Sequence, residues 1–155
     1  MRHVRPVDGN DLDCVCGHRH AMFVEMGSVD EEQLLRSEAP FRSWLKLRLE
    51  DGRYYGFIVE QEGKVVAGIG LTEIDWAPGP AHPESERRGL IMNLYVEPGY
   101  RRAGIARELV LLAEQEFSRR GLGHAILHAS DQGAPLYESL GWEKSSEMAK
   151  RLPLP

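Results

Sequence analysis

The chain has 155 residues, of which 42% are hydrophobic and 28% are charged, and its net charge is −5 at pH 7. This length predicts a single domain, residues 1–155, with a sizeable core. The acidic balance excludes a basic nucleic-acid-binding surface, and no apolar run is long enough to span a membrane. The first residues lack the apolar core of a signal peptide, and two cysteines are too few for a disulfide framework. A cytoplasmic location is therefore expected.

The N-terminal part predicts one strand followed by two helices. Residues 4–7 are typical of a short strand, and the first helix is expected to run to about Met26. Ser28–Glu31 matches a capping box, in which the two side chains satisfy each other's backbone donors. The second helix is expected to be interrupted near Pro40 and to end at residues 51–52.

Cys14, Cys16, His18 and His20 alternate along the first predicted helix and raise the question of a metal site. On a helix, residues 14 and 18 share one face while 16 and 20 share another. The four side chains then cannot converge on one ion, so no metal site is expected.

The middle and C-terminal parts predict further strands around one long helix. Strands are expected at 54–60, 64–74, 90–96, 124–129 and 142–152, and helices at 105 to about 120 and 134–140. The turn at Glu62–Gly63 predicts a hairpin, and the three prolines in 76–88 predict a loop. The strand–helix–strand unit within 90–129 implies a parallel pair. We therefore expect a mixed α/β sandwich whose sheet has six to seven mostly antiparallel strands and a central parallel pair, flanked by about four helices.

The turn after the strand at 90–96 predicts a pyrophosphate-binding site. The N–H groups of the first helical turn have no partners within the helix, and the helix dipole places partial positive charge there. Arginine guanidinium groups at the mouth suit phosphate, and small residues allow it to approach the backbone. The predicted binding residues are Arg101, Arg102, Ala103, Gly104, Ile105 and Ala106. No Gly-Lys-Ser/Thr follows, and Gly68–Gly70 lacks the third glycine of a dinucleotide fingerprint.

The pattern Arg101-x-x-Gly104-x-Ala106 resembles the R/Q-x-x-G-x-G/A motif of the GCN5-related N-acetyltransferases (GNAT). A second segment, residues 136–142 (LYESLGW), is similar to that family's L-Y-x-x-L-G-F/W signature. The predicted order of elements agrees with the family over nearly the whole chain. The resemblance implies the GNAT acyltransferase fold, an N-acetyltransferase activity, acetyl-coenzyme A (acetyl-CoA) as co-substrate without a metal, and an amine as acceptor. A homodimer is left open.

The resemblance also implies roles for individual residues. Main-chain groups of Leu94, Tyr95 and Val96 would pair with the pantetheine amides, as an added strand would. Tyr137 would act as general acid toward the departing thiolate. Ser130 stands where the family often has asparagine, and a serine can also bind the cofactor arm. Leu90 stands where histone-type members carry a catalytic glutamate.

A base and the acceptor-binding residues must therefore come from elsewhere in the chain. Glu73 is the first choice for the base, because a carboxylate on an apolar strand face is desolvated, which raises its pKa. His128 is a weaker candidate. Asn93 and Glu25 are candidates for acceptor binding, each with an ordinary structural role as the alternative.

The acceptor is left open among a polyamine, an amino acid, an aminoglycoside and a protein N-terminus. We expect direct attack in a ternary complex, because no cysteine lies near the cofactor motifs. The main alternative is a non-catalytic acyl-CoA-binding domain. A third is an unrelated nucleotide-phosphate-binding protein.

Overall fold

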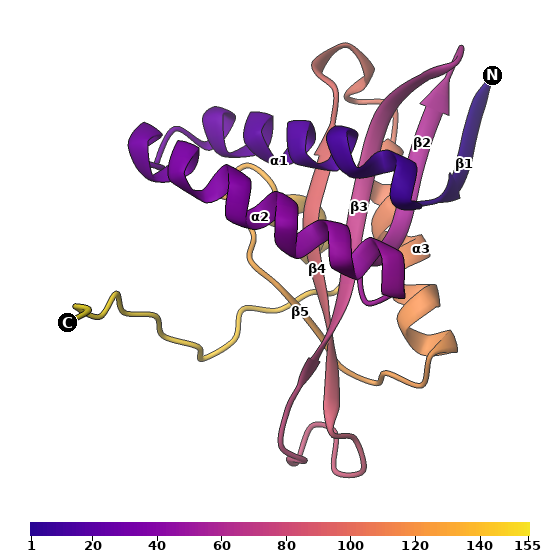
Figure 1. Cartoon of the computed structure of the whole chain (residues 1–155). Helices are drawn as coiled ribbons and strands as arrows, with labels where there is room; N and C mark the ends of the chain where they lie inside the picture. The colour runs from indigo at the N-terminus through magenta and orange to yellow at the C-terminus, as the bar shows by residue number, and fades with distance from the viewer.

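A computed structural model describes all residues, 1–155, and shows a twisted five-stranded sheet between two layers of helices (Figure 1). The strands lie in the order of the chain: β1 (Arg2–Pro6), β2 (Tyr55–Gln61), β3 (Lys64–Asp75), β4 (Arg87–Val96) and β5 (Ala125–Leu127). Neighbouring strands are antiparallel except β4 and β5, which are parallel. The expected parallel pair is confirmed, although it lies at one end of the sheet order.

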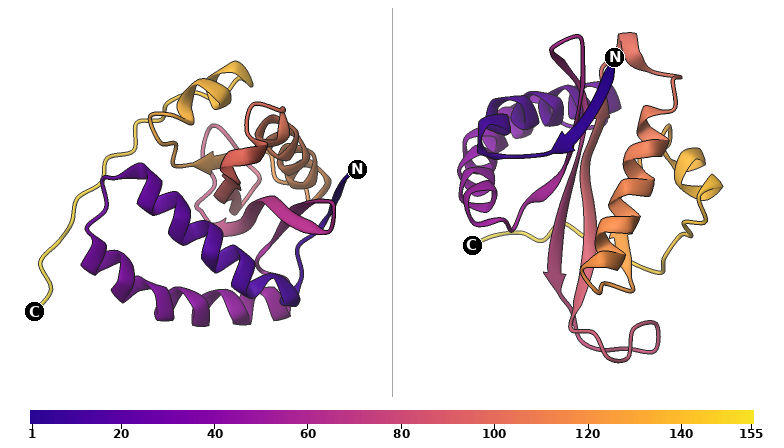
Figure 2. Two further views of the ribbon diagram at one scale, coloured as in Figure 1. Left: turned by 90° about the horizontal axis from the view of Figure 1, so that it is seen from above. Right: turned by 90° about the vertical axis from the view of Figure 1, so that its right-hand side faces the viewer.

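The helices divide between the two faces of the sheet. They are α1 (Leu12–Met26), α2 (Glu31–Asp51), α3 (Ile105–Arg119) and α4 (Ala134–Ser139), with single 3-10 turns η1 (Gly9–Asp11) and η2 (Pro98–Tyr100). Figure 2 shows α1 and α2 covering one face, while α3 and α4 lie on the other. None of the helices combines the length and apolar composition that crossing a membrane requires.

The main core lies between the sheet and α3. Apolar side chains recur along α3 at helical spacing, and their burial against β3 and β4 holds the helix on the sheet. The fully buried members from α3 are Leu109, Val110, Ala113 and Phe117. A smaller cluster of Val15, Leu45 and Tyr54 holds α1 and α2 on the opposite face.

The predicted hairpin and first helix are confirmed. Glu62 and Gly63 both have positive φ angles, 52° and 76°, as a tight two-residue turn between β2 and β3 requires. The segment with the alternating cysteines and histidines is helical, and α1 ends at Met26 as expected. No group of three His, Cys, Asp or Glu side chains is arranged to hold a metal ion.

The closing strand expected at 142–152 is absent, so the sheet has five strands instead of six to seven. Every residue from Glu143 to Pro155 is exposed, and no strand of the same chain pairs with this segment. A strand-type pattern forms a strand only where a neighbouring edge supplies hydrogen-bond partners.

The second helix also differs from the expectation. The helix α2 is continuous through Pro40, and its N-cap is Asp30, whose carboxylate accepts a hydrogen bond from Glu32 N–H, in place of Ser28. Pro40 removes the donor for the carbonyl four residues before it, but Pro40 and Arg36 are both exposed, so water can satisfy that carbonyl. An exposed proline therefore does not interrupt this helix.

The close packing of Phe117 against Gly89 in β4 yields a stability prediction. A Cβ at position 89 would lie 2.7 Å from the Phe117 ring, which is buried and cannot move aside. Gly89→Ala should therefore lower the free energy of unfolding in urea by about 1–3 kcal/mol. As the control, Gly17→Ala lies on an exposed turn of α1 with nothing nearby and should raise stability by up to about 1 kcal/mol. Equal effects of the two substitutions would contradict this account.

Candidate active site

The central feature of the site is the separation of β4 from β5. The two strands pair only where Gly89–Ile91 faces Ala125–Leu127, whereas β4 stays paired with β3 as far as Val96. Residues 92–96 of β4, which include Leu94 and Tyr95, therefore present an edge that no strand covers. Unpaired main-chain groups on such an edge can bind an extended ligand as an added strand would.

A bulge in β4 accompanies the separation. The register between β3 and β4 shifts between Gly68 and Gly70, and Asn93 opposite has a positive φ of 54°. The Asn93 side-chain amide donates a hydrogen bond to the buried Tyr54 hydroxyl at 3.3 Å. Tyr54 can lie there because residue 70 has no side chain: a Cβ on Gly70 would be 1.9 Å from that hydroxyl. Asn93, a candidate for acceptor binding, thus already has a structural partner.

The turn after β4 has a continuous run of free backbone donors. The N–H groups from Arg102 through Arg107 donate no hydrogen bond to any backbone carbonyl or side chain. Arg102 and Gly104 both have positive φ angles, 65° and 77°, and Gly104 is the N-cap of α3. Alternation of right- and left-handed backbone gathers N–H groups into an anion-binding concavity at the helix N-terminus. The geometry therefore suits a pyrophosphate.

The two arginines of the motif are arranged differently. The Arg101 guanidinium turns away from the helix and donates to both Glu25 carboxylate oxygens at 2.9 and 2.8 Å, and to the Val96 carbonyl at 2.8 Å. Tyr95 also donates its hydroxyl to Glu25, at 2.9 Å. Only the Arg102 side chain remains exposed without an ion-pair partner. Arg101 thus ties the turn to the end of α1, and Glu25 already has two partners.

Tyr137 lies on α4, on the α3 side of the sheet. Its ring packs edge-on against Trp142 at 6.2 Å, and the Trp142 indole donates to Glu114 of α3 at 2.8 Å. The half-buried phenol makes no side-chain hydrogen bond within the chain, and burial raises its pKa to about 12. The hydroxyl is therefore protonated at neutral pH and available as a hydrogen-bond donor.

Comparison with known proteins identifies this arrangement. The model of the acetyltransferase (GNAT) family matches residues 20–142. The chain belongs to the GNAT family. Its class is therefore N-acetyltransferase, and the co-substrate of this class is acetyl-CoA.

Solved structures agree with the assignment. A GCN5-related N-acetyltransferase from Ralstonia eutropha JMP134 is 45% identical, with 98% of this chain and 99% of that chain covered and a TM-score of 0.96. A predicted acetyltransferase from Clostridium acetobutylicum, solved with acetyl-CoA, is 22% identical, with 98% and 96% covered and a TM-score of 0.88. A ribosomal-protein-alanine N-acetyltransferase from Brucella melitensis biovar Abortus 2308 is 15% identical, with 100% of both chains covered and a TM-score of 0.67. The last two show a shared fold alone. A search of curated proteins finds no match.

Ser130 of this GNAT chain has a local role in the structure. Its hydroxyl accepts a hydrogen bond from Gly133 N–H at 3.1 Å, and its carbonyl accepts from Ala134 N–H at 2.9 Å. These bonds hold together the turn that leads into α4, the helix that carries Tyr137. A Cβ on Gly133 would lie 3.2 Å from the Ser130 hydroxyl and 3.4 Å from the Tyr137 ring, so the three residues are neighbours.

The two candidates for the base lie in different surroundings. Glu73 faces the α3 side of β3 and forms an ion pair with Arg87 at 3.2 Å, so it is not an isolated desolvated carboxylate. His128 is exposed and follows Leu127, the last residue of β5 that pairs with β4. Because Ala125 and Leu127 pack toward the α3 core, alternation places Ile126 and His128 on the α1–α2 side.

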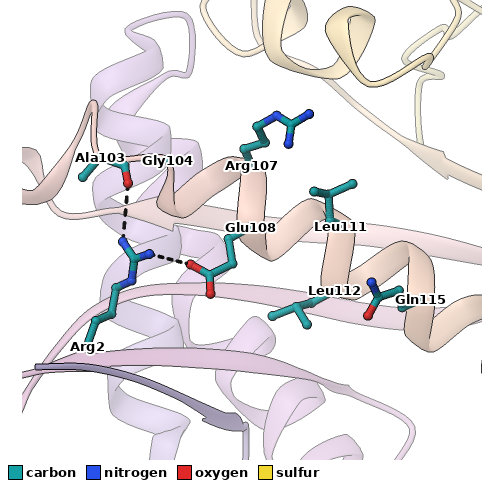
Figure 3. Close-up of a pocket in the computed structure, with 8 residues that line it drawn as sticks. All are labelled: Arg2, Ala103, Gly104, Arg107, Glu108, Leu111, Leu112 and Gln115. Carbon is teal, nitrogen blue, oxygen red and sulfur yellow. Dashed lines mark hydrogen bonds and ion pairs between the residues drawn. The ribbon is translucent and has the colours of Figure 1, made fainter.

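A surface groove of about 440 Å³ begins at the pyrophosphate turn of this GNAT protein and follows α3 (Figure 3). At its near end, Arg2 donates to the Ala103 carbonyl at 3.4 Å and pairs with Glu108 at 2.9 Å. Arg107 also lines it and is exposed. Sequence reasoning missed Arg107, although its position in the first turn of α3, one residue after the motif, was the available signal.

The free cations at the turn lead to a binding prediction. Arg102→Ala and Arg107→Ala should each raise the Kd for acetyl-CoA about 10-fold, since each removes about one charge-assisted interaction of roughly 1.4 kcal/mol. Isothermal titration calorimetry measures this directly. Arg119→Ala, at the far end of α3 and paired with Glu116, is the matched control and should leave Kd unchanged. Unchanged Kd values in both test variants would mean that the backbone alone binds the phosphates.

Proposed function

We propose that this protein transfers the acetyl group of acetyl-CoA directly to a primary amine of a small molecule or peptide, within a ternary complex. The observation that carries the proposal is Tyr137, a protonated phenol that makes no side-chain hydrogen bond and packs against the core between the sheet and α3. In the reaction, the amine nitrogen forms a bond to the thioester carbonyl carbon and the C–S bond breaks. The sulfur takes the Tyr137 proton, and a base accepts the proton that the amine loses.

The state of the cysteines supports direct attack rather than an acetyl-enzyme. Burial raises the pKa of the Cys14 thiol to about 11, and burial also raises the pKa of Cys16. Both thiols are therefore protonated and weakly nucleophilic at neutral pH. Both also lie on α1, on the face of the sheet opposite α3 and α4.

The roles of the remaining candidates follow from their partners. We assign the role of general base to His128 instead of Glu73. Glu73 is paired with Arg87, whereas His128 lies one residue beyond the point where β4 and β5 separate. An amine that approaches from the α1–α2 side then meets His128 opposite Tyr137. Glu25, which Arg101 holds in place, forms part of the wall of the acceptor-binding site in this proposal.

These ion pairs also support a proposal for the charge of the acceptor. Arginines neutralise both Glu25 and Glu73, so the two carboxylates do not attract a polycation. We therefore favour a singly charged amine over a polyamine. An amine panel assayed by acetyl-dependent release of CoA thiol tests this. A protein that binds acetyl-CoA but releases no thiol above background with any amine would instead be the non-catalytic acyl-CoA-binding domain.

Removing the proton donor tests the acid role. Tyr137→Phe should lower kcat by about 100-fold or more, the usual contribution of a positioned general acid, and leave the Kd of acetyl-CoA within about 2-fold. Because the phenol has a pKa of about 12, the wild-type rate should show no loss from tyrosine ionisation up to about pH 10. Stopped assays of kcat across pH, with calorimetric Kd values, measure both effects. An unchanged kcat would mean that Tyr137 only packs α4.

A pair of matched variants distinguishes the two bases. His128→Gln should lower kcat/KM at neutral pH by at least about 10-fold, because the amide cannot accept the proton that the amine loses. Glu73→Gln should change kcat/KM less than about 3-fold, since it removes only a partly exposed ion pair. The reverse ranking would return the base to Glu73.

A further inference from the structure

Three side chains join the pyrophosphate turn to the end of α1: Glu25, Tyr95 and Arg101. The Tyr95 hydroxyl donates to the Glu25 carboxylate at 2.9 Å, and the Arg101 guanidinium donates to it at 2.9 and 2.8 Å. His18 of α1 packs against the Tyr95 ring, with 4.9 Å between the centroids, so these side chains face α1. The backbone of Arg101, by contrast, begins the turn that leads into α3. The three side chains therefore lie between the pyrophosphate turn and the α1–α2 side, from which the amine approaches in the proposed function.

The helix α1 does not itself require a carboxylate at position 25. Glu25 directly precedes Met26, the last residue of α1, where the helix dipole is negative and a carboxylate disfavours the helix. A basic residue would be favourable in this last turn, yet it contains none. Residues that break a local rule of this kind are expected at functional sites, where another interaction compensates. The compensation for Glu25 is Arg101, so the reason for this carboxylate lies outside its own helix.

The Arg101 guanidinium has the capacity to bind a second anion. Its Nε donates to the Val96 carbonyl and its Nη2 donates to Glu25, whereas Nη1 makes no hydrogen bond within the chain. The side chains of Arg101 and Glu25 are 40% and 39% exposed, and ion pairs exposed to this degree contribute little to stability. The guanidinium fork also matches a phosphate group. The pair can therefore hold the turn against α1 and still give way to a more highly charged partner.

We propose that Arg101 is shared between the two substrates: the pyrophosphate of acetyl-CoA draws its guanidinium from Glu25, and the released carboxylate then binds the ammonium form of the acceptor. Each substrate supplies the counter-ion for the group that the other releases, so each raises the affinity for the other by the same factor. Glu73 stays paired with Arg87, so acetyl-CoA uncovers one carboxylate, which suits a singly charged amine. The acceptor half of this inference rests on the proposed function, and the exchange at Arg101 does not.

Calorimetry of acetyl-CoA binding tests the exchange without any turnover. Glu25→Gln frees the Arg101 guanidinium for the pyrophosphate and should lower the Kd about 5-fold. Arg101→Gln removes the guanidinium and should raise the Kd about 10-fold. S-acetylpantetheine lacks the pyrophosphate, so its Kd should agree within about 2-fold among the wild type and both variants. If the pair serves only to fix the turn, both substitutions loosen the turn and raise the Kd of acetyl-CoA, and the proposal is overturned.

Two further variants distinguish the exchange from the mere loss of a negative charge. Asp51→Asn removes the same charge from an exposed ion pair with Arg53, before β2 and at the opposite end of the sheet, and should leave the Kd of acetyl-CoA unchanged. With Arg101→Gln already present, Glu25→Gln should change the Kd less than about 2-fold, because the gain requires the freed guanidinium. A gain that persists without Arg101 would indicate direct repulsion between Glu25 and the pyrophosphate, and would overturn the proposal.

Steady-state kinetics with the best amine of the panel tests the acceptor half. Glu25→Gln should raise the KM for that amine at least about 10-fold and change kcat less than about 3-fold, since the carboxylate binds the amine and takes no proton from it. An unchanged KM would overturn the role of Glu25 toward the acceptor. If no amine is acetylated, the proposed function fails and this role fails with it, whereas the Kd values of acetyl-CoA still decide the exchange at Arg101.

Discussion

The contact of Tyr54 with Gly70 and Asn93 is the constraint on which the site depends. The buried phenol lies directly on the β3 backbone, where any Cβ would collide with it, and its hydroxyl receives the Asn93 amide. Asn93 takes a left-handed conformation there, and β4 changes register against β3 at this point. Beyond this bulge, β4 no longer runs beside β5. The open edge of β4 and the position of the phosphate turn at its end both follow from that change in course.

Charges around the site serve structure as much as binding. Arg101 holds the phosphate turn to α1 through Glu25, so the first arginine of the motif fixes the position of the turn, and Arg102 and Arg107 remain as free cations. Glu73 likewise pairs with Arg87 at the other end of the sheet. Trp142 links α4 to α3 through Glu114, and this link orients the Tyr137 ring. In this proposal, therefore, only some of the polar residues around the site contact a substrate.

Local patterns predicted the strand–turn–helix unit, the β2–β3 hairpin and the end of α1, because backbone propensity and nearby residues determine them. The bulge at Asn93 had no such signal, since the residue that its side chain bonds, Tyr54, lies 39 positions away. The Arg101–Glu25 pair joins residues 76 positions apart, which the spacing of the motif does not reveal. The tail illustrates the converse: its pattern predicted a closing strand at 142–152, but the segment pairs with no strand of the sheet and forms none.

The free N–H groups at residues 102–107 have a consequence for how this sequence can vary. Every amino acid except proline supplies the same amide donor, so replacement of a side chain in the turn removes none of these groups. What such a replacement alters is the space above the amides and the handedness of the backbone at Arg102 and Gly104. Tolerance at these positions should therefore follow side-chain size and backbone conformation rather than chemical type. The sequence signature of such a binding site is therefore a set of small residues and a glycine. The site can be retained while the charged residues around it are replaced.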